Sequence, residues 1–196
     1  MPDNRTFRIT QDDIEDLRER ANGRTSVQPL IEAYEFWISR SAVLDFVIGM
    51  INDAFQGQTL GDGIGLLEAH GIDDYAGDQE LAALRLQDEH LDWRCVKTET
   101  LNRCYAAPTF LDARGFIFYL PAFLIAELND EFDFGFIDRL FDPNPIPEGW
   151  VELLTHPQRE SVIAALNLVS EHPDYHHNKE PISMAISRIR NSTPMP

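Results

Sequence analysis

Cysteine and long apolar runs are both scarce in this sequence. Its two cysteines, Cys95 and Cys104, are nine positions apart and do not form the pattern of a disulfide-stabilised secreted domain. The longest apolar stretch, residues 42–51, is ten residues long and contains Asp45, so it is too short and too polar to span a bilayer. The first residues also lack the basic and apolar segments of a secretory signal. We therefore expect a cytoplasmic protein in a reducing compartment, with no membrane partner.

Positive charge is scarce as well, because 16 Lys and Arg residues stand against 33 Asp and Glu residues and the formal charge is −17. Nucleic-acid binding depends on a cationic surface, so no nucleic-acid partner is expected. The excess of acid is largest over residues 60–100, which hold ten acids and three bases. This charge would attract a basic protein partner. The alternative is that the acids only keep the protein in solution.

The motifs of covalent and nucleotide chemistry are missing. There is no GxSxG nucleophile elbow and no GxxxxGK phosphate-binding loop, and the glycines of GDGIGL do not match the dinucleotide-binding fingerprint. We therefore predict no cofactor. These absences favour a non-enzymatic role and leave carboxylate or metal chemistry as the enzymatic alternatives.

Apolar residues are present in the proportion of a folded protein. They make up 43% of the chain and include 12 phenylalanines. A chain of this size buries roughly 70% of the surface that its unfolded form exposes, so it can form a core without disulfides. We expect a single domain in which residues 1–50 form an N-terminal helical arm that packs on the core, and residues 51–196 form the helical core.

Several segments carry clear helix signals. Thr10 can cap a helix over residues 11–21. Apolar residues at helical spacing run from Leu30 to Phe55, a stripe that predicts core packing, and the sequence leaves open whether the stripe is one helix or two. Thr155 and Gln158 have the spacing of a capping box before a further helix.

The segment around residues 108–120 predicts a β hairpin. Two apolar runs flank Asp112 and Gly115, and this pair is typical of a type I turn followed by a bulge. Pro121 suits the first position of the next helix. The predicted fold class is therefore mainly α within an α+β arrangement: a single-domain helical array with a central hairpin.

A carboxylate cluster is the first candidate catalytic site. Glu68, Asp73 and Asp74 lie close together in a glycine-bounded loop, and Arg85 follows soon after. Paired acids can move their pKa values apart and so supply a general acid and a general base. The alternative is structural, because acids also cap helices and an arginine can neutralise a buried acid.

A histidine-rich segment, EHPDYHHN, is a weak candidate metal site. Carboxylates and imidazoles are common zinc ligands. However, Pro173 interrupts any helix here, so the i and i+4 spacing of helical zinc sites is not available. The alternative is a polar loop between two helices. The candidate ligands are His172, Asp174, His176 and His177.

A segment of alternating acids and phenylalanines is the candidate docking site. Phenylalanines can serve as anchors of a binding surface and acids as its rim. The alternative is that these phenylalanines belong to the core, because large exposed apolar patches are rare on monomers. The residues concerned are Asp130, Glu131, Phe132, Asp133 and Phe134.

Residues 52–168 resemble a bacterial family of proteins with a domain of unknown function. The resemblance is carried by NDAFQG, GIGLLEAHGIDDY, DEHLDW and LTHPQRESVIAAL, and above all by FLDARGFIFYLPAFL, which matches the pattern FLDxxGFxFYLPA. The resemblance implies a layout of a hairpin with helices and implies no activity, substrate or mechanism.

Our leading hypothesis is a non-enzymatic cytosolic protein that binds a basic protein, as an immunity protein or inhibitor does. It rests on the concentrated negative charge and on the missing catalytic motifs. The alternative is a hydrolase-type enzyme that uses the carboxylate and arginine group or the histidine and aspartate group. The sequence leaves the homo-oligomeric state open.

Overall fold

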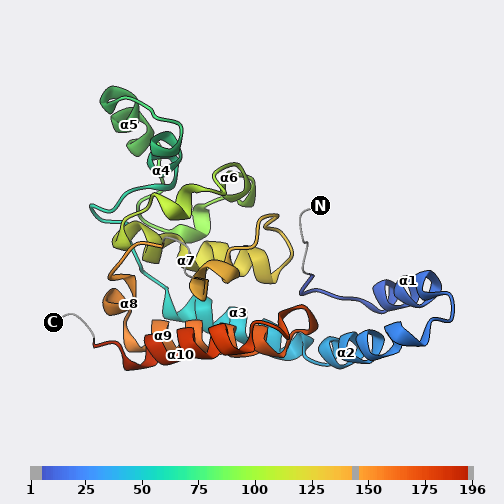
Figure 1. Cartoon of the computed structure of the whole chain (residues 1–196). Helices are drawn as coiled ribbons and strands as arrows, with labels where there is room; N and C mark the ends of the chain where they lie inside the picture. Colours follow the sequence, from blue (N-terminus) through green and yellow to red (C-terminus); the bar gives the residue numbers. More distant parts are fainter. Residues whose placement is uncertain (1–5, 143–145, 194–196) are drawn as a thin grey trace.

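The computed structural model describes residues 6–142 and 146–193, and these residues form helices joined by loops (Figure 1). Within these described residues, none of the helices has the length and apolar character that a membrane crossing requires. The α-helices of the described residues are α1 (Gln11–Ala21), α2 (Gln28–Ile38), α3 (Ser41–Ala54), α4 (Leu66–Asp73), α5 (Asp78–Arg85), α6 (Thr98–Arg103), α7 (Ala113–Leu128), α8 (Trp150–Leu153), α9 (His156–Glu171) and α10 (Lys179–Asn191). The short 3-10 turns are η1 (Thr25–Val27), η2 (Trp93–Cys95), η3 (Ala107–Thr109), η4 (Ile137–Leu140) and η5 (Pro173–Tyr175).

Helix α7 is the centre of the core. Every residue from Gly115 to Leu124 is buried, so the helix is covered on all sides. It packs against α3, α8 and η2, while α9 packs against both α3 and α10 (Figure 1). A helix that is apolar all round is typical of the middle of a protein.

The predicted hairpin at residues 108–120 is wrong, because the described residues contain no β-strand and α7 covers most of that segment. The two residues that indicated a turn instead begin the helix: the Gly115 N–H donates to the Asp112 carboxylate at 2.8 Å. A short apolar run that is buried on both sides fits a covered strand and a buried helix equally well. The described fold is therefore all-α and not α+β.

Pro121 lies inside α7 rather than at the start of a separate helix. Proline has no N–H, so the Ile117 carbonyl does not receive the helical hydrogen bond from four residues later, and such a proline costs about 3 kcal/mol. The neighbouring Phe118 and Phe123 are fully buried. Packing of α7 in the core offsets the free-energy cost of Pro121. Rules that place proline at the start of a helix consider only local sequence and do not include this packing.

Two local capping predictions are confirmed. The Thr10 hydroxyl accepts a hydrogen bond from the Asp13 N–H (3.3 Å) at the start of α1, and the Gln158 side chain accepts one from the Thr155 N–H (2.9 Å) at the start of α9. The apolar stripe over residues 30–55 is divided into α2 and α3. Most of the stripe is inside, but Leu30 is exposed.

A short segment before α1 connects the N-terminal helices to the core. Phe7 is buried against Trp37 and His172, and the Trp37 Nε1–H donates to the Phe7 carbonyl at 2.8 Å. The N–H groups of Phe7 and Arg8 donate to the Asp130 carboxylate at 2.6 and 2.7 Å. Helix α1 packs on α2, and both helices extend away from the rest of the molecule (Figure 1). The division into residues 1–50 and 51–196 stays a prediction.

Candidate functional site

Helices α4 and α5 form a hairpin that projects from the body of the protein (Figure 1). Helix α5 packs mainly on α4, and none of its eight residues is buried. Gly71 lies where the two helices approach each other, because a Cβ at this position would lie 2.5 Å from Leu84 Cδ1 and 3.0 Å from Leu81 Cδ2 and these leucine side chains would have to shift. The hairpin is therefore an exposed structure whose outer helix adds little to the core.

The hairpin is acidic at its tip. Residues 66–85 hold five acids and one arginine. Arg85 donates to Glu68 at 2.7 Å, so this pair is neutral as a unit. The other acids lie at the end of α4 and the start of α5, where no arginine or lysine pairs with them in the described residues; they are Asp73, Asp74, Asp78 and Glu80.

Tyr75 lies at the tip with a positive φ of 59°. It follows the C-cap residue Asp74 in a Schellman motif, in which the Tyr75 N–H donates to the Ile72 carbonyl (3.1 Å) and the Ala76 N–H to the Gly71 carbonyl (2.8 Å). This position usually holds glycine, because a Cβ is crowded in the left-handed region. The Tyr75 side chain is 96% exposed, so packing within the chain does not offset the strain.

A buried carboxylate holds the base of the hairpin. Asp88 accepts hydrogen bonds from the N–H groups of Leu67 (2.7 Å) and Glu68 (3.1 Å), so a residue after α5 caps the start of α4. Gly65 makes room for this contact, because a Cβ there would lie 2.0 Å from Asp88 Oδ2. Burial raises the pKa of the Asp88 carboxyl, and the two backbone hydrogen bonds act in the opposite direction without cancelling it.

The raised pKa of Asp88 predicts the sign of a pH dependence. A carboxyl with a higher pKa in the folded state gives stability that is fully present below its unfolded value, near 3.8, and that is lost as the pH rises through the folded value. We therefore expect the free energy of unfolding of the wild type, relative to Asp88→Asn, to fall between strongly acidic and neutral pH. Urea denaturation of both proteins over this range measures it. A difference that grows toward neutral pH would contradict the assignment.

The predicted catalytic carboxylates do not converge on the arginine. Glu68 pairs with Arg85, whereas Asp73 and Asp74 gather near His70, with His70 Nε2 lying 3.6 Å from Asp74 Oδ2. One ligand atom from each of His70, Asp73 and Asp74 lies within 4.8 Å of the others, and among the described residues this is the group whose side chains could hold a metal ion. The arrangement is an ion pair of Glu68 and Arg85 that lies apart from the His70, Asp73 and Asp74 group, and the catalytic role of these residues stays a prediction.

The candidate metal ligands near the C-terminus have different environments. His172 is buried, with Nε2 lying 3.0 Å from the Thr6 carbonyl and Nδ1 accepting from the Asp174 N–H at 3.2 Å. His176 and His177 are exposed, with ring centroids 3.5 Å apart. In the described part of the chain, these residues do not form a group of three convergent ligands. His172 joins the N-terminal segment to the core.

The candidate docking segment is divided between the core and the surface. Phe132 is 7% exposed, and the Asp130 carboxylate binds the backbone of the N-terminal segment. Glu131 and Asp133 are exposed, and Phe134 is partly exposed. The segment is therefore partly structural: Phe132 lies in the core and the exposed Asp130 binds backbone, whereas Glu131, Asp133 and Phe134 are exposed.

Two residues that the site depends on were missed from the sequence. Tyr75 gave no signal, because its left-handed backbone is visible only when the end of α4 is known. Asp88 caps a helix that begins more than twenty positions earlier, so the capping rules, which compare near neighbours, do not find it. The run of acids around residue 75 was the one available signal.

The described residues thus define an all-helical protein with an acidic projecting hairpin. A family model described as a family of unknown function (DUF6714) matches residues 44–188, and the chain belongs to this family. The match begins within α3 and includes the whole α4–α5 hairpin. Comparisons with curated proteins and with solved structures found no match.

Proposed function

We propose that this protein is a non-enzymatic protein-binding module of the immunity or inhibitor type, which binds a basic protein through the α4–α5 hairpin. The observation that supports this best is Tyr75, an exposed aromatic side chain kept at a strained position on an acidic tip. We place the protein in the cytoplasm. The free thiols of Cys95 and Cys104 fit a reducing compartment.

Tyr75 differs from the other residues with a positive φ. Among the described non-glycine residues, Asn22 and Asp130 share this backbone conformation, and their short polar side chains tolerate it. Asp130 occupies the equivalent Schellman position after α7, where its carboxylate gains two backbone hydrogen bonds. The exposed Tyr75 side chain has no comparable backbone hydrogen bonds among the described residues. The left-handed conformation of this residue costs roughly 1–2 kcal/mol of stability. Strain of this kind at an exposed site is typical of functional positions.

The hairpin also has the composition of a binding surface. Tyrosine is enriched among the residues that dominate the energy of protein interfaces. The acids around the tip would steer a basic partner toward it, with an association rate that falls as salt rises. Leu86 and Leu91, which are 85% and 75% exposed, lie in the segment that follows α5 and provide further apolar area.

The test of this function begins with affinity capture from native lysate at low and high salt, followed by affinity measurement with the purified partner. We expect a basic protein to be retained at low salt and released at high salt. We expect Tyr75→Ala to weaken its binding by about tenfold or more, as for a central interface residue. Asp74→Asn with Glu80→Gln should slow association.

Matched controls keep this test specific. Phe46→Ala removes another exposed aromatic side chain, 68% exposed, from α3, and Asp12→Asn with Glu19→Gln removes two exposed charges from α1. Neither control should alter binding. The proposed function fails if no partner is retained at either salt concentration, or if Phe46→Ala weakens binding as much as Tyr75→Ala does.

Tyr75→Gly gives a second readout that needs no partner. Glycine is favoured at this position, so the free energy of unfolding should rise by about 1 kcal/mol, while binding weakens as it does for the alanine variant. Urea denaturation of the purified chain measures the first effect. A loss of stability in Tyr75→Gly would mean that the tyrosine supports the fold, and it would remove the argument for a functional role.

A further inference from the structure

A cavity of about 350 Å³ lies at the base of the hairpin, on the side of α6. Its walls come from the start of α4, the segments before and after η2, helix α6 and the centre of α7. Leu66, Leu67 and Val96 give the cavity an apolar part, and Tyr119 contributes an aromatic ring. A volume of this size suits a small organic molecule.

One wall of this cavity presents two cations and a hydroxyl. Lys97, the N-cap residue of α6, lines it together with Thr100 and Arg103, which are three positions apart within the helix. Neither Lys97 nor Arg103 forms an ion pair with a carboxylate in the described residues, although Arg103 approaches the Cys104 thiol. Elsewhere in the described residues, seven arginines do pair with carboxylates, so the charges of Lys97 and Arg103 are not neutralised in that way.

The acids that line the cavity are engaged by the backbone. Asp88 accepts from the first turn of α4, as described above. Glu89 Oε1 accepts from the N–H groups of Leu91 (2.8 Å) and Asp92 (3.1 Å), and these bonds lower the pKa of the Glu89 carboxyl. The Tyr119 hydroxyl donates to the Glu89 carbonyl at 3.2 Å. The charged donors that stay available in this lining are therefore those of the α6 wall, Lys97 and Arg103.

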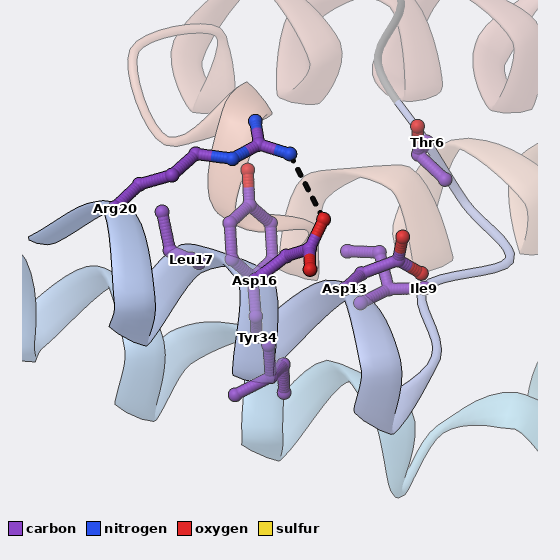
Figure 2. A pocket seen from close by; sticks show the side chains of 8 residues that line it. Thr6, Ile9, Asp13, Asp16, Leu17, Arg20 and Tyr34 are labelled. Carbon is purple, nitrogen blue, oxygen red and sulfur yellow. Dashed lines mark hydrogen bonds and ion pairs between the residues drawn. The ribbon is translucent and has the colours of Figure 1, made fainter.

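A second cavity shows the opposite pattern. It has a volume of about 220 Å³ and lies between α1 and Tyr34 (Figure 2). Its charged groups satisfy one another: Figure 2 shows Arg20 turned to Asp16, at 3.0 Å, and the Tyr34 hydroxyl donates to Asp174 at 2.7 Å. Among the described residues that line this second cavity, the one cation, Arg20, is paired with Asp16, which distinguishes it from the cavity beside α6.

We propose that the cavity beside α6 binds a small organic anion. Its carboxylate or phosphate group lies between Lys97, Thr100 and Arg103, which donate charge-assisted and neutral hydrogen bonds to it. Its apolar portion contacts Leu66, Leu67 and Val96. This site is separate from Tyr75 and does not depend on the proposed protein partner.

Cys95 supplies a direct probe of occupancy. It lines the same cavity and is exposed, whereas Cys104 is buried and burial raises the pKa of its thiol, so an alkylating reagent should modify Cys95 selectively. We would measure the rate of alkylation by the neutral reagent iodoacetamide at constant ionic strength, with hexanoate, inorganic phosphate or the uncharged hexanamide present. Hexanoate or phosphate should slow the reaction in a saturable way, and hexanamide should not. The anion that protects at the lower concentration identifies the carboxylate or the phosphate class.

Charge variants then test the residues. Lys97→Met and Arg103→Met should each raise the concentration of anion needed for half protection by about tenfold. Lys179→Met and Arg190→Met remove exposed cations from α10 and serve as controls, with no expected change. Far-UV circular dichroism verifies that each variant is folded. The proposal is overturned if neither anion protects Cys95, if hexanamide protects as well as hexanoate, or if protection is unchanged in both Lys97→Met and Arg103→Met.

Discussion

Gly115→Ala is expected to lower the free energy of unfolding by about 3 kcal/mol. A Cβ at this position would lie 2.1 Å from the Ile64 carbonyl oxygen, and a backbone atom cannot move aside as the end of a flexible side chain can. The same contact is held by Asp112, whose Oδ1 accepts from the N–H groups of Gly115 (2.8 Å) and Ile64 (3.0 Å). Separating the two backbones would therefore break this shared cap as well. Urea denaturation measures the loss.

Gly49→Ala is the matched control for this substitution. Gly49 lies in the middle of α3 on an open surface, where an added Cβ meets no heavy atom within 4 Å. Alanine is the better helix former, so this variant should be more stable by about 0.5–1 kcal/mol. If Gly115→Ala were as stable as the wild type, the contact between residue 64 and the start of α7 would be looser than the structure has it.

This contact also explains why the sequence predicted a hairpin at this place. Asp and Gly three positions apart are typical of a turn, and they are equally suited to a helix N-terminus at which a loop comes close. The decisive partner is Ile64, which lies about fifty positions earlier in the chain. A local pattern contains no information about that approach. Whether this segment forms a helix or a hairpin therefore depends on contacts that exist only in the folded protein.

Local signals nevertheless predicted much of the helical fold. The caps at Thr10 and Thr155 depend on residues three positions away, and both are present. The apolar stripe from Leu30 to Phe55 also predicted helical packing on the core, and the structure divides it into α2 and α3. Helices whose signals lie within one or two turns were therefore predictable, whereas the central helix α7, which is apolar on every side, was not.

The candidate site was predicted in part. The acids near residue 74 do form an exposed surface, but their relation to Arg85 was not predictable, because it depends on how α5 folds back on α4. The strain at Tyr75 depends on where α4 ends, and the position of Asp88 depends on a loop returning to the start of α4. Each of these features depends on the tertiary fold, so the role of the side chain cannot be predicted from the neighbouring sequence.

Asp130→Gly is expected to lower the free energy of unfolding by about 2 kcal/mol and to release the segment before α1. The Asp130 carboxylate accepts from the Phe7 and Arg8 N–H groups at 2.6 and 2.7 Å, and hydrogen bonds to a charged group are worth about 1.5–3 kcal/mol. Phe7 would then lose its support against Trp37. Hydrogen exchange should show faster exchange of the Phe7 and Arg8 amides, and denaturation should show the lower stability.

Glycine is the informative replacement here because Asp130, like Tyr75, occupies the left-handed position of a Schellman motif. Glycine relieves the strain of the left-handed backbone at both positions, which raises the free energy of unfolding. Only the loss of side-chain contacts can therefore make one variant more stable and the other less stable. We expect Tyr75→Gly to gain stability and Asp130→Gly to lose it. Asp133→Ala, which removes a nearby exposed acid, should leave stability within about 0.5 kcal/mol. If Asp130→Gly were also stabilising, its carboxylate would not be the tether of the N-terminal segment, and Asp130 would return to the candidate docking residues.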